Sequence, residues 1–261
     1  MSKPLPSLFL SHGSPMLAVE DSPAGRFLDG LGAELPRPRA IVIASAHFPA
    51  PGPSLGAAEH PATVHDFNGF PAPLYEIRYP APGDASLADA IAGRLADAGL
   101  APKLLPAQGL DHGIWVPLRR MYPQADIPVV PLSVDPHGDA AHHLAVGRAL
   151  APLRDDGVLV IGSGGFVHNL GDLNWGDRDA PMPTWASEFS SWMREKLAAG
   201  DLDSLLGWEA LAPNARRAHP TVEHLMPLFV ALGVGGDSAG VRVLHRSREF
   251  GSLALDAFAF E

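Results

Sequence analysis

Short, almost continuously apolar runs alternate along this chain with segments in which apolar residues recur every three or four positions. The apolar runs are typical of strands buried on both faces, and they cover residues 7–10, 40–46, 103–107, 128–134, 158–164 and 240–246. The second pattern predicts helices over residues 86–100, 138–153, 183–200 and 220–233. Within the last helix, Pro227 is expected to cause a kink or to mark the true first turn.

Strands that alternate with helices predict an α/β fold, with a mostly parallel central sheet covered by helices on both faces. No internal repeat, linker or low-complexity tract divides the chain, so we expect a single three-layer α/β/α domain over residues 1–261. Residues 47–85 form a long segment without a clear pattern. Loops of this length are uncommon unless they are functional, so we expect active-site loops here.

Composition excludes several kinds of function. The chain has no cysteine, which rules out disulfides, thiolate metal sites and cysteine nucleophiles. A net charge of −10 without a basic run argues against nucleic acids and anionic membranes as partners. No apolar run approaches the roughly 18–20 residues of a membrane span, and no signal peptide is recognisable, so a cytoplasmic location is expected.

Histidine is abundant, with 12 residues, and three of them end or closely follow apolar runs. His12 follows the first run in FLSHGSP, His47 the second in IVIASAHFP, and His168 the fifth in LVIGSGGFVHNL. Ligands of open α/β sheets bind beyond the carboxyl ends of the strands, so these side chains are expected to converge. Gly13 and Pro15 can turn the chain away sharply and leave His12 facing that crevice.

Further histidines lie at expected helix starts. His112 stands beside Asp111 in GLDHGIWVPL, and RRAHPTVEHLMP contains His219 and His224 with Glu223 between them. Any one of these rings could simply hydrogen-bond a loop carbonyl. Their number in a cysteine-free chain favours a metal or catalytic site.

Other sequence patterns are weaker indications of function. GSGGFVHN is not a dinucleotide-binding motif, since Val167 replaces the third glycine, and it is not a nucleophile elbow, since two glycines follow Ser163 directly. We expect a glycine turn that frees backbone N–H groups and presents His168. His142 and His143 lie on a predicted helix and are expected to be solvated.

Six segments, in this order and at these separations, resemble the DOPA 4,5-dioxygenase-like branch of the class III extradiol ring-cleaving dioxygenases. They are SHGSPM, SAHF, HDFNGFPAPLYEIRYPAPG, DHGIWVPL, GSGGFVHNL and HPTVEHLMPL. The resemblance runs from about residue 7 to residue 233. The superfamily also includes the catalytic subunit of protocatechuate 4,5-dioxygenase, and the Memo protein, which has the fold without established ring-cleaving chemistry.

The resemblance implies a role for each matched histidine. His12, His47 and His224 would hold the metal, His168 would be the acid/base residue, and His112 a second pocket histidine. Glu223 adjoins the position where the usual iron triad has a carboxylate. Neighbouring helix residues point about 100° apart, so only one of the pair can reach the metal, and the resemblance favours His224.

The implied reaction is the opening of a catechol ring with O₂ outside the two hydroxyls, on a small DOPA-like or related aromatic diol. Fe²⁺ is the expected active metal, although Zn²⁺ suits the same site. An all-histidine site is expected to leave the metal charge uncompensated until a catecholate binds. His168 is expected to accept a phenolic proton at its ordinary pKa of about 6.5, and His112 to hydrogen-bond bound oxygen or donate a proton.

Two alternatives stay open at this point. A zinc-dependent hydrolase would use activated water, with only Asp111 and Glu223 available as a base in the matched segments. A Memo-like protein would bind metal or ligand without catalysis, although it would need neither His112 nor His168.

Aromatic and cationic residues near the motifs are equally open to two interpretations. They could sandwich a substrate ring or anchor the long segment to the core, and they are Phe48, Phe67, Phe70, Tyr75 and Trp115. Arg78 and Tyr79 could meet a substrate carboxylate, or Arg78 could form a surface ion pair.

Overall fold

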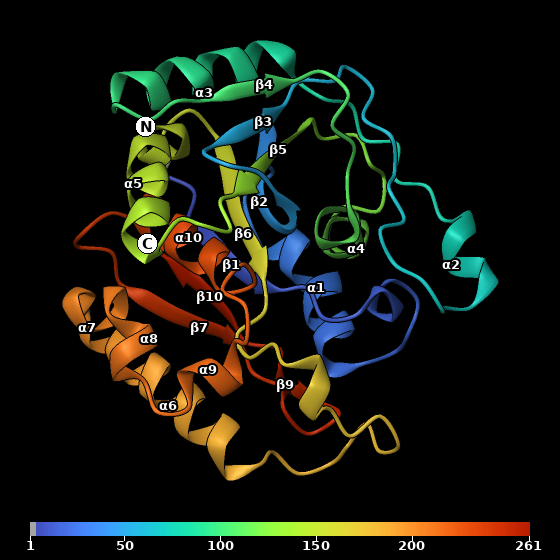
Figure 1. Cartoon of the computed structure of the whole chain (residues 1–261). Helices are drawn as coiled ribbons and strands as arrows, with labels where there is room; N and C mark the ends of the chain where they lie inside the picture. The colour runs from blue at the N-terminus through green and yellow to red at the C-terminus, as the bar shows by residue number, and fades with distance from the viewer. Residues whose placement is uncertain (1–3) are drawn as a thin grey trace.

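The computed structural model describes residues 4–261, so residues 1–3 of the expected domain lie outside the described part. An eight-stranded sheet runs through the molecule, with helices on both faces (Figure 1). Its strands, in spatial order, are β4 (Lys103–Leu105), β3 (Ser54–Gly56), β5 (Val129–Val134), β2 (Ala40–Pro49), β6 (Val158–Gly164), β1 (Ser7–Ser11), β10 (Ala257–Phe260) and β7 (Val241–His245).

The four central strands β5, β2, β6 and β1 are parallel, whereas β3 pairs antiparallel with β5, and β10 with β1 and β7. This confirms the predicted α/β class with its mostly parallel sheet. Residues of β2 alternate between the two faces. Ile41 and Ile43 join the core beneath α1 (Pro23–Glu34) and α4 (His112–Met121).

The opposite face of the sheet carries a second core. Val42 of β2 packs there with apolar residues of α3 (Ala85–Asp97), α5 (Ala140–Leu150) and α10 (Met226–Gly235). A third cluster joins α6 (Thr184–Ala199) to Phe9 and Phe258 of the sheet. The remaining elements are η1 (Pro15–Ala18), α2 (Ala72–Glu76), η2 (Ala151–Arg154), η3 (Leu170–Asp172), α7 (Leu202–Leu206), α8 (Trp208–Leu211), α9 (Ala215–Ala218), β8 (Arg248–Glu249) and β9 (Leu253–Ala254).

All six predicted strands and the first three predicted helices are present. The fourth helix begins later than predicted, at Met226, with Pro227 in its first turn, so residues 220–225 form turns instead. The segment 47–85 is more structured than expected, because it contains β3 and α2. Among residues 4–261, no helix is both long and apolar enough to cross a membrane.

Candidate metal centre

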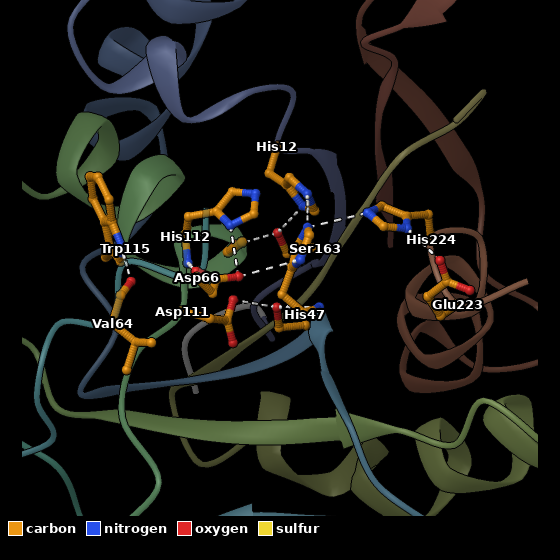
Figure 2. A network of polar contacts seen from close by, with 12 residues as sticks. His12, His47, Val64, Asp66, Asp111, His112, Trp115, Ser163, Glu223 and His224 are labelled. Atoms are coloured by element: carbon orange, nitrogen blue, oxygen red, sulfur yellow. Dashed lines mark hydrogen bonds and ion pairs between the residues drawn. The ribbon is translucent and has the colours of Figure 1, made fainter. Parts of the chain in front are cut away.

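Three histidine side chains that are far apart in the sequence meet at the carboxyl end of the central strands (Figure 2). The Nε2 atom of His47 lies 3.1 Å from Nε2 of His12 and 3.2 Å from Nε2 of His224. His12 and His224 are buried, while the His47 side chain is 24% exposed. The cluster is therefore reached from solvent at one side.

The strand order explains two of these positions. His12 follows β1 directly, and its backbone N–H donates to the Gly164 carbonyl of β6 at 3.0 Å. His47 lies near the end of β2, on the other side of β6. Gly13 has a φ of +62°, a left-handed conformation that glycine tolerates best, so the expected sharp turn after His12 is present.

His224 belongs to no strand. Close packing of its backbone against the glycines of β6 brings it to the cluster. A Cβ atom on Gly164 would lie 2.1 Å from the His224 carbonyl oxygen, and one on Gly162 would lie 2.0 Å from that of Pro227. Only glycine allows this backbone approach. Gly165 then donates its N–H to the His224 carbonyl at 2.8 Å. The glycines of GSGG thus bring His224 to the sheet, in addition to starting the turn toward His168.

The protonation of the three rings follows from their outer partners. The Ser163 hydroxyl donates to the Gly113 carbonyl, so it must accept from Nδ1–H of His12, 3.1 Å away. Nδ1 of His224 lies 3.0 Å from a Glu223 carboxylate oxygen. Nδ1 of His47 lies 3.4 Å from Asp66 Oδ2. With each Nδ1 carrying the proton, each Nε2 presents a lone pair to the shared centre.

A metal cation fits this centre. Lone pairs 3.1–3.2 Å apart with no proton between them repel, and a cation removes the repulsion. Metal–nitrogen bonds of about 2.1 Å place ligands about 3.0 Å apart at right angles and about 3.4 Å apart in a tetrahedron. The observed spacing therefore accommodates both octahedral iron and tetrahedral zinc.

Burial keeps the three rings neutral. Burial and the neighbouring imidazoles lower the pKa of His12 and His224 well below the usual range. Burial is also the main cause that lowers the pKa of His47 to about 3. Neutral imidazoles are the form that binds metal ions.

Two carboxylates lie directly behind the cluster, which corrects one expectation. Asp66 contacts His47, and Glu223 contacts His224, so two negative charges would face a divalent metal before any substrate arrives. The metal charge is therefore not left uncompensated. Of the neighbouring residues Glu223 and His224, it is His224 that faces the centre. The Glu223 carboxylate contacts the far side of the His224 ring, at Nδ1.

His112 is the first residue of α4, as its predicted place at a helix start implied. Its ring lies 3.9 Å, centroid to centroid, from the ring of His47. Its Nδ1 donates to Asp66 Oδ2 at 2.9 Å, and its backbone N–H donates to Oδ1 at 2.9 Å. Burial alone would raise the pKa of Asp66, but the hydrogen bonds from His112 outweigh it and lower the pKa.

His168 lies on the other side of the cluster. Its ring stacks on the ring of His224, with centroids 3.5 Å apart and planes 5° apart. Its backbone N–H donates to the Ala218 carbonyl at 3.0 Å, which fixes the loop after β6. Burial lowers the pKa of His168 to about 4, so the expectation of an ordinary value near 6.5 is wrong.

Two other histidines are structural. His143 is buried, against the expectation of a solvated ring, because Nε2 accepts from the Asp135 N–H at 3.0 Å and Nδ1 donates to the Asp139 carbonyl at 2.8 Å. His219 stays outside the cluster. It is buried beside Trp208 and donates from Nε2 to the Phe166 carbonyl at 3.1 Å.

The aromatic residues of the long segment hold it to the core and to itself. Trp115 is fully buried and donates from its indole N–H to the Val64 carbonyl at 2.9 Å. Tyr75 accepts from the Phe70 N–H at 3.3 Å through its hydroxyl. Phe67, another aromatic residue of this segment, also contacts the site. Its ring lies edge-on to that of His112, with centroids 5.7 Å apart.

The expected roles of Arg78 and Tyr79 in substrate binding find no support in their contacts. Arg78 donates to the carbonyls of Tyr75 and Ile77, and the hydroxyl of the buried Tyr79 donates to the Tyr122 carbonyl. Arg78 thus serves the local backbone, and Tyr79 ties the segment to the end of α4.

The chain is similar to known proteins over most of its length. The family described as LigB, the catalytic LigB subunit of aromatic ring-opening dioxygenase, matches residues 6–255. The chain belongs to this family.

Two relatives and one solved structure resemble this ring-opening dioxygenase over nearly its full length. A 4,5-DOPA dioxygenase extradiol from Beta vulgaris is 42% identical and covers 97% of this chain and 96% of its own. The protein of the same name from Escherichia coli strain K12 is 40% identical, over 96% of this chain and 93% of its own. A crystal structure of an uncharacterized protein from Escherichia coli K12 has a TM-score of 0.83 and 35% identity, with 98% and 100% coverage.

Sequence reasoning did not identify Asp66 or Ser163 as parts of the site. Asp66 stands in HDFNGFP, one of the segments that carried the resemblance, and its place within that segment was the available signal. Ser163 was weighed only as a nucleophile, whereas its hydroxyl fixes the His12 ring.

Proposed function

We propose that this dioxygenase opens the ring of a DOPA-like catechol, with His12, His47 and His224 as ligands of one divalent metal. The observation that carries the proposal is the convergence of three Nε2 lone pairs, each fixed by a partner at Nδ1. The substrate class rests on the relatives named 4,5-DOPA dioxygenase extradiol. We also propose that residues 1–261 form one catalytic domain, and a cytoplasmic location stays a prediction.

Iron is the proposed metal. When bound, Fe²⁺ would accept the adjacent oxygens of a catechol and transfer electron density from the ring to O₂, whereas zinc has no such redox chemistry. His12, His47 and His224 would hold the ion and would leave it coordination positions for substrates. Zn²⁺ could occupy the same ligands, and we expect that form to be inactive in ring opening.

The chain's own residues would handle protons and exclude water. A pKa of about 4 leaves His168 unprotonated at neutral pH, so its ring is ready to accept a proton from a substrate hydroxyl. The negative charge that develops on the substrate would favour the protonated ring. His112 lies across the cluster and would contact the second substrate, O₂, or the diol.

The hydrolase alternative lacks a free base. Glu223 is engaged by His224 and Thr221. Asp111 is buried, accepts from Ser45 at 2.6 Å, and has its pKa raised to about 6 by burial. Neither carboxylate is placed to activate water at the centre, and the retained His112 and His168 argue against a non-catalytic Memo-like protein.

A reconstitution experiment tests the proposal. Metal-free protein is loaded anaerobically with Fe²⁺ or Zn²⁺, mixed with DOPA, and then exposed to O₂. We expect one O₂ consumed per DOPA and a new visible chromophore with iron only. Ester or amide hydrolysis by the zinc form, without O₂ uptake on any catechol, would overturn it.

A further inference from the structure

Asp66 makes more contacts with the site histidines than do Ser163 and Glu223, the residues that contact Nδ1 of His12 and His224. It belongs to the long segment between β3 and α2, and its side chain is 23% exposed. Oδ1 accepts the backbone N–H of His112, while Oδ2 accepts Nδ1–H of His112 and lies 3.4 Å from Nδ1 of His47 (Figure 2). A single carboxylate therefore joins two rings and the first turn of α4.

We infer that Asp66 is a positioning residue that fixes the Nδ1–H tautomer of both His47 and His112. The inference rests on the proposed function, because it treats His47 as a metal ligand. It extends that function by assigning one residue to two tasks, namely orienting a ligand and setting which nitrogen His112 offers to substrate.

The tautomers follow from the chemistry of the acceptor. An ionised carboxylate has no proton to donate, so Nδ1 of His112 must supply the proton of their 2.9 Å hydrogen bond. The same negative charge, 3.4 Å from Nδ1 of His47, favours a proton on that atom as well. In the Nδ1–H tautomer, each ring carries its lone pair at Nε2. For His47 this atom lies within 3.2 Å of the Nε2 atoms of His12 and His224. For His112 it lies on the side of the ring that faces His12 (Figure 2).

This assignment narrows the role of His112. In the Nδ1–H tautomer, His112 can accept a hydrogen bond at Nε2 but cannot donate one there. In this tautomer it would therefore accept from a hydroxyl of the diol. The sequence-based expectation was that His112 hydrogen-bonds the bound oxygen or donates a proton.

His47, Asp66 and His112 also form a group that could hold a metal by themselves. The hydrogen bond from His112 Nδ1–H to Asp66, with Nδ1 of His47 3.4 Å from the same oxygen, accounts for this group without a second ion. A metal there would have to replace both protons, so the two interpretations predict different numbers of bound metals.

The test reads the tautomers directly in metal-free protein at pH 7.5. Long-range ¹H–¹⁵N NMR correlations distinguish Nδ1–H from Nε2–H for each histidine of wild type, Asp66→Asn, Asp66→Ala and Glu223→Gln. Asp66→Asn keeps the shape but removes one acceptor oxygen, and near-UV circular dichroism shows whether each variant keeps its packing. Glu223→Gln is the matched control, since Glu223 contacts His224 alone among the three ligands.

We expect Nδ1–H at His47 and His112 in wild type, loss of that preference at both in Asp66→Ala, and a change confined to His224 in Glu223→Gln. Zn²⁺ affinity, measured by chelator competition, should fall about 10–100-fold in Asp66→Asn. Unchanged tautomers in Asp66→Ala would overturn the inference. Two Zn²⁺ per wild-type chain, with the second lost in Asp66→Ala, would also overturn it. Neither the tautomers nor the Zn²⁺ affinity depends on turnover. An enzyme inactive on all catechols would therefore contradict the proposed function without contradicting this inference.

Discussion

On one flank of the histidine cluster, Asp66 holds His112 through hydrogen bonds and lies 3.4 Å from Nδ1 of His47. On the other flank, the glycines of β6 admit the backbone of His224, and His168 stacks on its ring. The first flank depends on a side chain from a long loop, and the second depends on close packing against the sheet. Rings in one site can thus be oriented by electrostatics or by shape, and the two flanks should respond differently to substitution.

The largest effect is expected on the packed flank. Gly164→Ala places a Cβ atom against the His224 carbonyl, so we expect loss of the metal site and destabilisation of about 1–3 kcal/mol or more. Metal content and urea unfolding measure both. Gly93→Ala is the control, because its Cβ meets nothing within 4 Å in α3, and it should be neutral or slightly stabilising. Wild-type metal binding in Gly164→Ala would refute the packing argument.

Removing the stacked ring should separate catalysis from binding. His168→Ala is expected to keep the metal and to lose about 10²–10⁴-fold in kcat, because the proton acceptor is gone while the three ligands stay. Stopped-flow oxygen uptake, together with the iron content of the same samples, gives both quantities. An unchanged kcat would show that the acid/base residue does not lie on this flank.

A single outer carboxylate should matter less. Glu223→Gln removes the charge behind His224 but leaves the glycine contacts that place its backbone. We expect a loss of about 10-fold in Zn²⁺ affinity, at the lower end for such partners. A larger loss than in Asp66→Asn would contradict the view that packing, and not charge, orients His224.

His143, remote from the cluster, is expected to have the smallest effect on the metal site, and it gives a reference for pH dependence. Burial lowers its pKa to about 4, so the unfolded chain binds the extra proton first as pH falls. Its contribution to stability is therefore lost between pH 6.5 and 4, and amounts to about 3 kcal/mol at most. Urea unfolding of metal-free protein across this range should show a shallower pH dependence for His143→Gln, and an equal slope would contradict this.

The strands were predictable because buried parallel strands read as continuous apolar runs, and the strand ends then placed His12 and His47. The family resemblance supplied His224, which no strand pattern predicts, since its position depends on a backbone approach at Gly164. Asp66 was missed because its partners lie 46 residues away in α4 and on a separate strand. The short strand β10 was not predicted, because the four-residue pattern AFAF is too brief to distinguish a strand from an irregular terminal segment.

The central claim is that one metal ion is shared by the Nε2 atoms of His12, His47 and His224. Anaerobic titration of metal-free protein with Fe²⁺ tests it most directly. The account predicts one iron per chain in wild type, His112→Ala and His168→Ala, and no tight binding in His12→Ala, His47→Ala or His224→Ala. One tightly bound iron per chain in His12→Ala would contradict it.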